Sequence, residues 1–211
     1  MTPELVVGFD LDMTLIDSRP GIAATLEALS AETGVAIDAA LVVSRLGPTL
    51  EEEMANWYPP ELVDAVSDRY RELYAELGVP GCAPLPGARD AVEAVAEAGG
   101  RNLVVTAKYE PSARKCLAHV GLDVDVVVGW RWGPDKAVTL AEHRAIAYVG
   151  DTPSDMAAAG GAGALAVGVP TGPHPTGELR TAGADVVLDS LTDFAAWFHD
   201  LRRTREATGG A

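Results

Sequence analysis

Positive charge, cysteine and long apolar runs are all scarce in this sequence of 211 residues. The 16 Lys and Arg are outnumbered by 31 Asp and Glu, which gives a net charge of -15. Nucleic acids and anionic membranes select for clustered basic residues, so this balance argues against both as partners. No apolar run approaches the roughly 18 residues that a membrane-spanning helix needs. An anionic small molecule would need local positive charge to be held in such a protein.

Cys82 and Cys116 are the two cysteines of the sequence. Their separation matches no metal-ligand spacing, and two cysteines do not make a disulfide framework. We expect two reduced thiols, in the core or near the surface of a cytoplasmic protein. Residues 1–4 lack a basic segment and lead directly into an apolar run, so no signal peptide is expected.

Short runs rich in β-branched residues recur along the chain and alternate with segments of helical period. This alternation predicts a parallel sheet with right-handed crossovers and helices on both faces. The fold class expected is therefore α/β, with a Rossmann-like, doubly wound parallel sheet as its core. The predicted strands are Leu5–Phe9, Leu103–Val105, Val124–Val128, Ala145–Val149, Ala164–Val169 and Asp185–Leu188, and the predicted helices between them include Ala88–Ala98, Pro111–Val120 and Pro153–Ala159.

Residues 17–82 break the alternation, because they show helical patterning and no convincing strand. Gly34 follows the apolar face of Gly21–Thr33 as a C-terminal signal, Asp38 is placed to cap a helix that reaches Arg45, and Thr49-x-x-Glu52 has the form of a capping box. A further helix is predicted over Pro60–Leu77. The segment ends in a stiff stretch rich in Pro and Gly, residues 80–87.

This helical block is inserted directly after the first strand, so we expect it to lie over the carboxyl end of that strand as a cap. The predicted division is a catalytic core of residues 1–16 and 83–203, a helical cap of residues 17–82, and a flexible tail of residues 204–211.

Three polar side chains follow predicted strands at the point where each strand ends: Asp10, Thr106 and Asp151. Ligands of open α/β sheets bind beyond the carboxyl ends of the strands, so these residues are expected to share one edge. Lys136 precedes the strand that leads to Asp151. Two carboxylates one residue apart, Asp10 and Asp12, are typical of a site that holds a hard divalent cation.

The sequence around these residues resembles the haloacid-dehalogenase-like (HAD) hydrolase superfamily. Four ordered segments carry the resemblance: Phe9–Ser18, Val104–Lys108, Lys136 and Val149–Asp155. The helical insert, with Leu46–Glu51, is most similar to the phosphoglycolate-phosphatase branch. The resemblance implies a Mg²⁺-dependent phosphatase that hydrolyses a small phosphate monoester, with phosphoglycolate as a candidate substrate.

The chemistry assigns a role to each acid, and the resemblance implies the same roles. Asp10 is the expected nucleophile, which gives an aspartyl-phosphate intermediate. Asp12 is expected to protonate the leaving oxygen and then to accept a proton from the attacking water. Mg²⁺ would be held by Asp10, the backbone carbonyl of Asp12, and Asp151, with Asp155 as a further or indirect ligand.

Phosphate binding is expected from the Thr106 hydroxyl and the Ala107 N–H, with Lys136 offsetting the charge of the transition state. Family members most often have Gly where Met13 stands, and the short segment after Lys136 leaves Lys108 as the alternate cation. Asp151 and Asp155 could equally cap the helix that begins near Pro153.

Two features of the sequence bear on specificity. Arg45 precedes the Leu46-Gly47-Pro48 loop, so it is a candidate contact for a substrate carboxylate, or else a helix-end arginine. Trp130 and Trp132 could wall the pocket, but we favour packing on the outside of the sheet or in a dimer contact. The protein is expected to be a monomer or a homodimer.

Other functions remain open at this point. A sugar phosphomutase and a nucleotide or pyrophosphate hydrolase of the same superfamily keep the same acids. A phospho-accepting signalling domain fits poorly, because such domains have adjacent acids on the first strand and no helical insert. A binding-only scaffold would show no turnover. A phosphonatase needs a lysine in the insert, and residues 17–82 contain none.

Overall fold

The protein is built on a six-stranded parallel sheet with the strand order β5-β4-β1-β6-β7-β8. The computed structural model describes residues 5–47 and 49–207. All neighbouring strands of this sheet run parallel, which confirms the predicted α/β class and the six predicted strands. The strands are β1 (Val6–Phe9), β4 (Arg101–Val105), β5 (Val126–Val128), β6 (Ala147–Gly150), β7 (Leu165–Gly168) and β8 (Val186–Val187).

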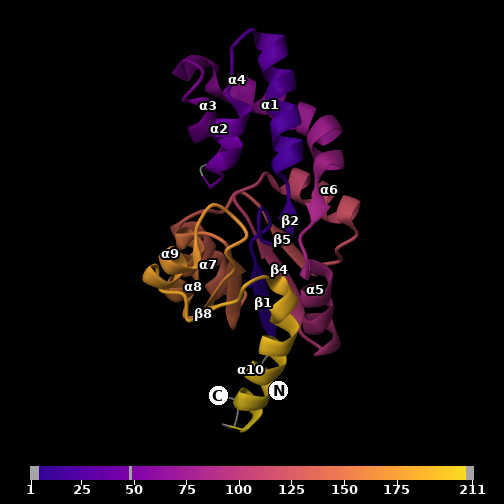
Figure 1. Ribbon diagram of the computed structural model, residues 1–211, viewed down its shortest axis with the longest axis vertical. Coiled ribbons are helices and arrows are strands. Elements are labelled where there is room, and N and C mark those ends of the chain that lie inside the picture. The colour runs from indigo at the N-terminus through magenta and orange to yellow at the C-terminus, as the bar shows by residue number, and fades with distance from the viewer. Residues whose placement is uncertain (1–4, 48, 208–211) are drawn as a thin grey trace.

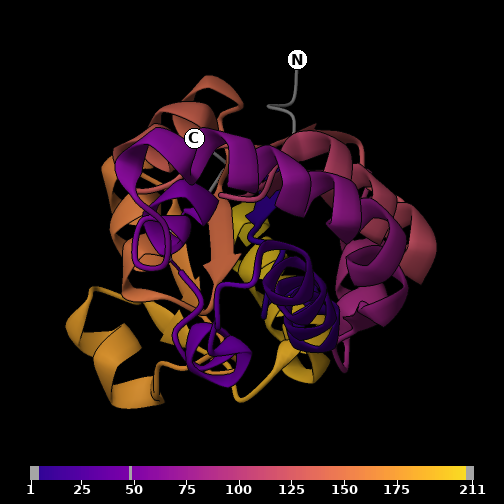
Figure 2. The ribbon, with the colours of Figure 1, turned by 90° about the horizontal axis from the view of Figure 1, so that it is seen from above.

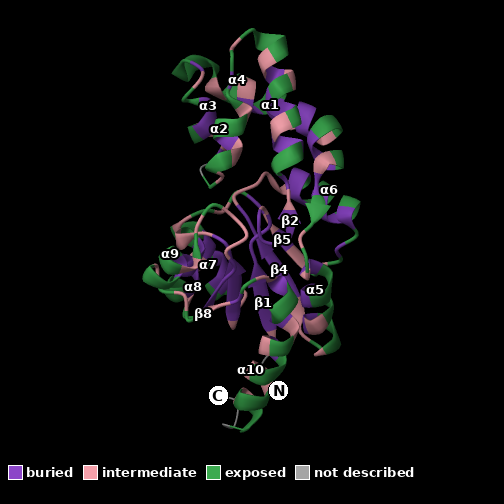
Figure 3. Cartoon of the chain, in the orientation of Figure 1, coloured by how far each residue is buried: buried purple, intermediate pink, exposed green. Residues whose placement is uncertain are grey.

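Helices cover both faces of the sheet, so it is doubly wound (Figure 1). Successive side chains of a strand point to opposite faces, and in β1 Val7 packs in one apolar cluster while Val6 packs in the other. Both faces of the central strands are therefore buried (Figure 3). One cluster includes α5 (Ala88–Glu97), α6 (Glu110–Val120) and α10 (Phe194–Ala207), and the other includes α7 (Pro134–Glu142), α8 (Pro153–Ala162) and α9 (Thr176–Thr181).

Residues 19–81 form a block of helices, as the sequence predicts. The signals read from the sequence operate locally: Gly34 is left-handed with φ 73°, the Asp38 carboxylate accepts from the Leu41 N–H, and Thr49 with Glu52 makes a capping box. The last helix is shorter than predicted, because the backbone changes to a π turn at Tyr74. The elements are α1 (Arg19–Thr33), α2 (Ala39–Ser44), α3 (Leu50–Met54), α4 (Pro60–Leu73), η1 (Tyr74–Gly78) and η2 (Val79–Gly81).

The helical block stands over the carboxyl end of the sheet, at the end opposite to α10 (Figures 1 and 2). Its two connections to the core pair with each other as a short antiparallel ribbon, β2 (Ile16–Asp17) with β3 (Ala83–Pro84). The sequence predicts no strand between residues 17 and 82 and a stiff stretch at residues 80–87, so this ribbon is a difference from the prediction. Two-residue strands, one of them with a proline, leave no alternating pattern to detect.

Three glycines hold the base of the block together. A Cβ added to Gly21 in α1 would overlap the carbonyl of Gly78, and one added to Gly81 would lie 2.6 Å from the Gly21 Cα. Only residues without a side chain allow backbones to approach this closely. The start of α1 and the end of the block are thus packed directly against each other.

At the C-terminal end, α10 continues to Ala207, whereas the sequence predicts a flexible tail from Thr204. The rest of that predicted tail, residues 208–211, lies outside the described residues, as do residues 1–4, where a signal peptide was sought, and Pro48. Among the described helices, none has the length and apolar character that crossing a membrane requires.

Candidate active site

Three neighbouring strands of the sheet deliver the predicted polar residues to one edge. Asp10 follows β1, Thr106 follows β4 and Asp151 follows β6, and β1 lies between the other two strands. All three side chains are buried yet line one cavity. Carboxylate oxygens of Asp10, Asp151 and Asp155 lie within 4.8 Å of one another. The sheet order therefore explains how acids far apart in the sequence meet.

Lys136 reaches this cluster from the first turn of α7. Its Nζ donates to Oδ1 of Asp10 at 3.0 Å and to Oδ1 of Asp155 at 2.6 Å, with only 5% of the residue exposed. Burial alone would lower the pKa of Lys136, but the charges of Asp10 and Asp155 outweigh it and raise that pKa well above its usual value. Lys136 is therefore a permanent positive charge beside the expected nucleophile.

One lysine does not neutralise the buried acids. Burial, together with the nearby charges of Asp155 and Asp12, raises the pKa of Asp10 to about 7, although Lys136 opposes the shift. Burial, followed by the charges of Asp10 and Asp155, raises the pKa of Asp151 to about 8. These shifts measure how unfavourable the unpaired negative charge is in this pocket.

The donor set fits a magnesium ion. Its oxygen atoms are hard ligands, few enough to leave room for phosphate oxygen and water, and the excess of negative charge calls for a cation. Asp10 and Asp151 are the carboxylates best placed to hold it, because both line the cavity. The Thr14 hydroxyl donates to Oδ1 of Asp151 at 3.1 Å and fixes that carboxylate.

Asp155 is fully buried and its two oxygens already have partners. Oδ2 accepts from the Thr152 N–H at 3.1 Å and pairs with the Thr152 hydroxyl at 2.7 Å, which completes a capping box on α8. Oδ1 binds Lys136 and, at 3.3 Å, the hydroxyl of Tyr148. Asp155 thus caps the helix and orients Lys136, whereas Asp151 makes no cap.

A second lysine, Lys108, pairs with the second acid of the loop, Asp12. Lys108 Nζ donates to both carboxylate oxygens of Asp12, at 2.9 and 3.1 Å, and lies 4.5 Å from the centre of the Tyr74 ring. The sequence presents Lys108 as an alternative to Lys136 for one role. In the structure the two lysines lie at different acids, Lys136 at Asp10 and Lys108 at Asp12.

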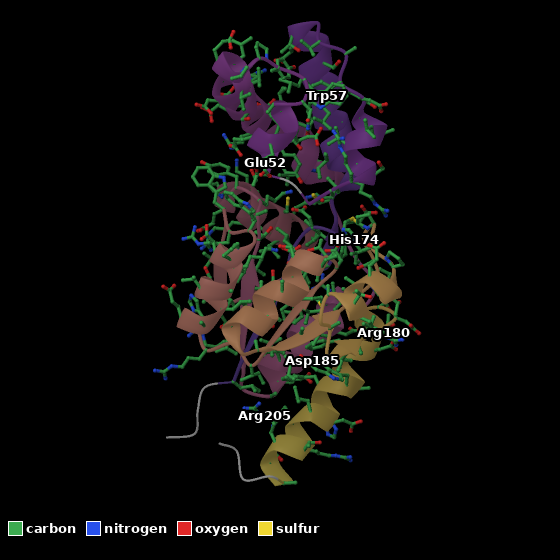
Figure 4. All side chains as sticks on the ribbon, turned by 90° about the vertical axis from the view of Figure 1, so that its left-hand side faces the viewer. Glu52, Trp57, His174, Arg180, Asp185 and Arg205 are labelled. Atoms are coloured by element: carbon green, nitrogen blue, oxygen red, sulfur yellow. The ribbon has the colours of Figure 1, made fainter. Side chains whose placement is uncertain are left out.

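The cavity encloses about 180 Å³ between the sheet edge and the helical block. Such a volume suits a small ester better than a polymer. In Figure 4, Glu52 and Trp57 lie in the helical block, while His174 and Asp185 lie in the core below it. The core lines the cavity with Asp10, Asp12, Thr106, Ala107, Lys108, Lys136 and Asp151, and the block lines it with Arg45, Leu46, Glu53, Met54, Tyr70, Arg71 and Tyr74, among others.

The two tryptophans lie along this cavity rather than against the outside of the sheet, so that part of the preference stated from the sequence is wrong, whereas a dimer contact stays a prediction. Trp130 and Trp132 both line the cavity and are 51% and 46% exposed. The Trp130 backbone has φ 53°, and its N–H donates to the Lys108 carbonyl at 3.0 Å. A main-chain link between two loops therefore turns this ring toward the pocket.

Two arginines of the helical block border the cavity. Arg45 is the one expected from the sequence; its side chain is 41% exposed and forms an ion pair with Glu53 at 2.7 Å. Arg71 in α4 is only 14% exposed and stacks on Tyr109 and Trp130, 5.6 and 5.5 Å from their ring centres. The Arg71 Nε is buried and has no hydrogen-bond partner.

Met13 explains how the loop after Asp12 forms without the glycine that is usual there. Its backbone has φ 61°, in the left-handed region that glycine occupies most easily, and its side chain is buried. The Met13 N–H donates to the Ile16 carbonyl at 2.8 Å, and Thr171 donates its hydroxyl to the Met13 carbonyl. Hydrogen bonds and burial thus hold the loop in a strained conformation.

Several residues of the site have no role predicted from the sequence, notably Thr14, Arg71 and Tyr148. Thr14 lies within Phe9–Ser18, the first segment that resembles the family, and its position two residues after Asp12 could have marked it as part of the site. The Tyr148 hydroxyl donates to the Val105 carbonyl at 2.7 Å as well as to Asp155. No local pattern marks a tyrosine in a buried strand or one arginine of a charged helix as part of a site.

Comparison with known proteins agrees with this geometry. The family model described as haloacid dehalogenase-like hydrolase matches residues 7–160, and a related HAD-hydrolase-like model matches residues 134–194. The first match spans Asp10, Thr106, Lys136 and Asp151, so it includes the residues that the sheet brings together.

Curated relatives cover nearly the whole chain at modest identity. A probable phosphatase, IndB, of Dickeya dadantii is 28% identical over 93% of this chain and 94% of its own length. A phosphoglycolate phosphatase of Pectobacterium atrosepticum is also 28% identical, over 89% of each chain. Among solved structures, a haloacid dehalogenase-like family hydrolase of Streptococcus pneumoniae matches with a TM-score of 0.79 and 24% identity, over 94% of this chain and 100% of its own. At 24% identity, the similarity to this solved structure shows the fold alone.

Proposed function

The chain belongs to the haloacid dehalogenase-like hydrolases, and we propose that it is a Mg²⁺-dependent phosphatase that hydrolyses a small phosphate monoester through an aspartyl-phosphate on Asp10. The observation that carries this proposal is the convergence of Asp10, Asp151 and Lys136 in one buried cluster beside Thr106. Relatives named phosphatase over nearly the full length support it.

In the first step Asp10 attacks phosphorus while the bond from phosphorus to the ester oxygen breaks. Lys136 contacts Oδ1 of Asp10, so attack through Oδ2 keeps that contact and leaves the lysine beside the transferring group. The leaving oxygen takes a proton from the carboxylic acid form of Asp12, and this leaves Asp12 as the carboxylate that Lys108 contacts. The Thr106 hydroxyl and the Ala107 N–H bind non-bridging oxygens of the phosphoryl group.

In the second step water attacks phosphorus, Asp12 accepts its proton, and the bond from phosphorus to Asp10 breaks. Lys108 holds the Asp12 carboxylate in place for both proton transfers. A bound Mg²⁺ would neutralise charge on the phosphoryl oxygens and orient them. Asp10, Asp151 and the backbone carbonyl of Asp12 would hold the ion, with Asp155 acting through Lys136 and Thr152.

The helical block, which we assign to residues 17–82, acts as the cap in this proposal. It closes over the substrate, excludes water and selects the group attached to phosphate. The small cavity favours a compact ester, and phosphoglycolate is the first substrate to test because relatives carry that name. The core in this division is residues 1–16 and 83–203.

Turnover of a panel of phosphate esters with and without Mg²⁺ tests the proposal, with Asp10→Asn as the control. We expect Mg²⁺-dependent release of phosphate and a loss of at least about a thousandfold in Asp10→Asn. Full activity of that variant would rule out Asp10 as the nucleophile.

The same panel separates the alternative functions. Isomerisation of a sugar phosphate without net release would indicate a mutase, and release from nucleotides or pyrophosphate alone would indicate that class of hydrolase. Absence of turnover for every ester would favour a binding-only scaffold.

Arg45, which pairs with Glu53, and Arg71, which pairs with Glu51 and Asp68, are the candidates for contacting the non-phosphate end of the substrate. A substrate carboxylate would take the place of a protein carboxylate, because guanidinium groups bind carboxylates through two hydrogen bonds. We expect Arg45→Ala and Arg71→Ala to raise KM for a carboxylated ester such as phosphoglycolate and to spare p-nitrophenyl phosphate. A KM that changes equally for both esters would assign the arginines to cap closure instead. Unchanged kinetics would remove them from the site.

A further inference from the structure

The two cysteines of the chain meet inside the protein, where the helical block joins the core. Cys82 lies in the connection between η2 and β3, and Cys116 lies in α6 of the core. Their sulfur atoms are 3.4 Å apart, and both residues are free thiols that are almost completely buried. This contact links the segment that carries the block to the body that carries the sheet.

The surroundings of the pair are polar for a buried site. The Tyr74 hydroxyl lies 3.3 Å from the Cys82 sulfur and 3.6 Å from the Cys116 sulfur. The hydrogen bond from Cys116 lowers the pKa of the Cys82 thiol to about 7, and the charge of Lys108 acts in the same direction. Cys82 is therefore the thiol that ionises more easily and reacts first.

We propose that Cys82 and Cys116 are a reversible thiol–disulfide site, oxidised by peroxide, and that the disulfide slows the enzyme by fixing the helical block to α6. The sulfurs need to approach from 3.4 Å to about 2.05 Å to bond. Cys82 has an extended backbone outside any helix or sheet strand, with φ -81° and ψ 141°, so it can make this movement without disrupting an element.

The reaction needs hydrogen peroxide as its oxidant and proceeds in two displacements. The Cys82 thiolate attacks one peroxide oxygen, the O–O bond breaks, and water leaves after taking up the thiol proton. The Cys116 sulfur then attacks the resulting sulfenic acid of Cys82, the S–O bond breaks, and a second water leaves. The two thiols lose two electrons in total, and one peroxide molecule gains them.

Two routes connect this bond to turnover, and both rest on the proposed function. The disulfide ties the connection at residue 82 to α6, so the block can no longer swing away to admit substrate. It also removes the thiol contacts of Tyr74, whose ring lies under the Lys108 ammonium that holds Asp12. Restricted opening is the effect we expect to dominate.

The test uses the full chain, treated with hydrogen peroxide and analysed by intact mass, peptide mapping and turnover of p-nitrophenyl phosphate. We expect a species two hydrogen atoms lighter, a peptide that joins Cys82 to Cys116, and a severalfold loss of turnover. Dithiothreitol should restore the mass and the activity. It does not reverse methionine sulfoxide, so the restored fraction belongs to the thiols.

Cys116→Ala is the matched variant, because alanine fits a helix and leaves Cys82 without a partner. We expect peroxide to reduce the turnover of Cys116→Ala only as far as it oxidises Cys82 alone, a loss that dithiothreitol also reverses. The melting temperature of Cys116→Ala shows whether this variant folds. If it does not fold, Cys82→Ala takes its place. Independent oxidation of the two sulfurs without a bond between them would overturn the site. If the disulfide formed and turnover stayed unchanged, the proposed regulatory effect would be wrong. If the disulfide formed in a protein that has no phosphatase activity, only the proposed function would be wrong.

Discussion

Asp10 and Asp151 are acids whose pKa values in the folded protein lie near neutrality, at about 7 and about 8. In the unfolded chain they ionise near the usual value of 3.8. The folded state therefore binds more protons than the unfolded state between pH 4 and pH 8, and raising the pH across this window lowers the stability of the metal-free protein. A cation in the cluster removes that penalty.

Asp151→Asn isolates this contribution. Without metal we expect the variant to melt at a higher temperature than the unsubstituted protein at pH 8, with the difference vanishing as the pH falls toward 4. Added Mg²⁺ should raise the melting temperature of the unsubstituted protein at pH 8 and leave the variant unchanged. Thermal denaturation at several pH values, with EDTA or Mg²⁺, measures both effects. If Asp151→Asn melted at a lower temperature than the unsubstituted protein at pH 8 without metal, the Asp151 charge would not be destabilising.

Gly172 lies against the Asp151 carboxylate so closely that an added Cβ would overlap its Oδ2. Gly172→Ala should therefore displace this expected ligand, weaken Mg²⁺ activation severalfold and raise the Mg²⁺ concentration needed for half-maximal turnover. Titration of activity with Mg²⁺ measures the shift. Gly177→Ala is the control, because its Cβ would meet nothing within 4 Å. Equal Mg²⁺ requirements in the two variants would contradict the role of Asp151.

Helix α8 is stabilised by Asp155, the residue that also orients Lys136. The capping box of Thr152 and Asp155 satisfies free N–H groups at the start of the helix, and the same carboxylate binds Lys136. Helix start and active site are thus parts of one hydrogen-bonded unit.

Thr152→Ala should lower the free energy of unfolding by about 1 kcal/mol and reduce kcat, because Asp155 loses a partner that holds it toward Lys136. Ser190→Ala removes the side-chain cap of η3 (Leu191–Asp193), none of whose residues lines the cavity, and should lower stability with kcat unchanged. Chemical denaturation and steady-state kinetics compare the two. An unchanged kcat in Thr152→Ala would show that capping and catalysis are independent.

The helical block is attached to the core beside the glycine contact at its base. Gly21→Ala places a methyl group against the Gly78 carbonyl, and we expect a loss of about 1 to 3 kcal/mol in stability from the forced shift. Gly160→Ala is the control, because this helical glycine in α8 has open space around it and alanine should stabilise the protein slightly. Urea denaturation measures both, and stability gains in both variants would contradict close packing at the hinge.

The sequence was sufficient to predict the parallel sheet, its six strands and the helical insert, because each rests on local periodicity or capping chemistry. The strand ends also predicted the edge at which Asp10, Thr106 and Asp151 meet, since parallel strands present their carboxyl ends together. The membership of the family is confirmed, whereas the role of each site residue stays a proposal.

Contacts between distant segments could not be predicted in this way. The pairing of Lys108 with Asp12 depends on how the loops after two neighbouring strands of the core fold against each other. The stacking of Arg71 on Trp130 and the meeting of the two cysteines depend on how the helical block rests on the core. No local pattern in the sequence encodes that placement. The ribbon of β2 and β3 was missed for the same reason, since each of its strands is defined only by the other.

Because of the ribbon of β2 and β3, the place where the helical block joins the core does not depend on the size or structure of the inserted segment. Asp17 and Ala83 pair directly across the ribbon, so their Cα atoms lie about 5 Å apart, a gap that a tight turn spans. Whatever lies between them enters and leaves the core at one place and disturbs no register of the main sheet. A lid of another size or shape could be exchanged there, and substrate preference could change while the chemical machinery stays as it is.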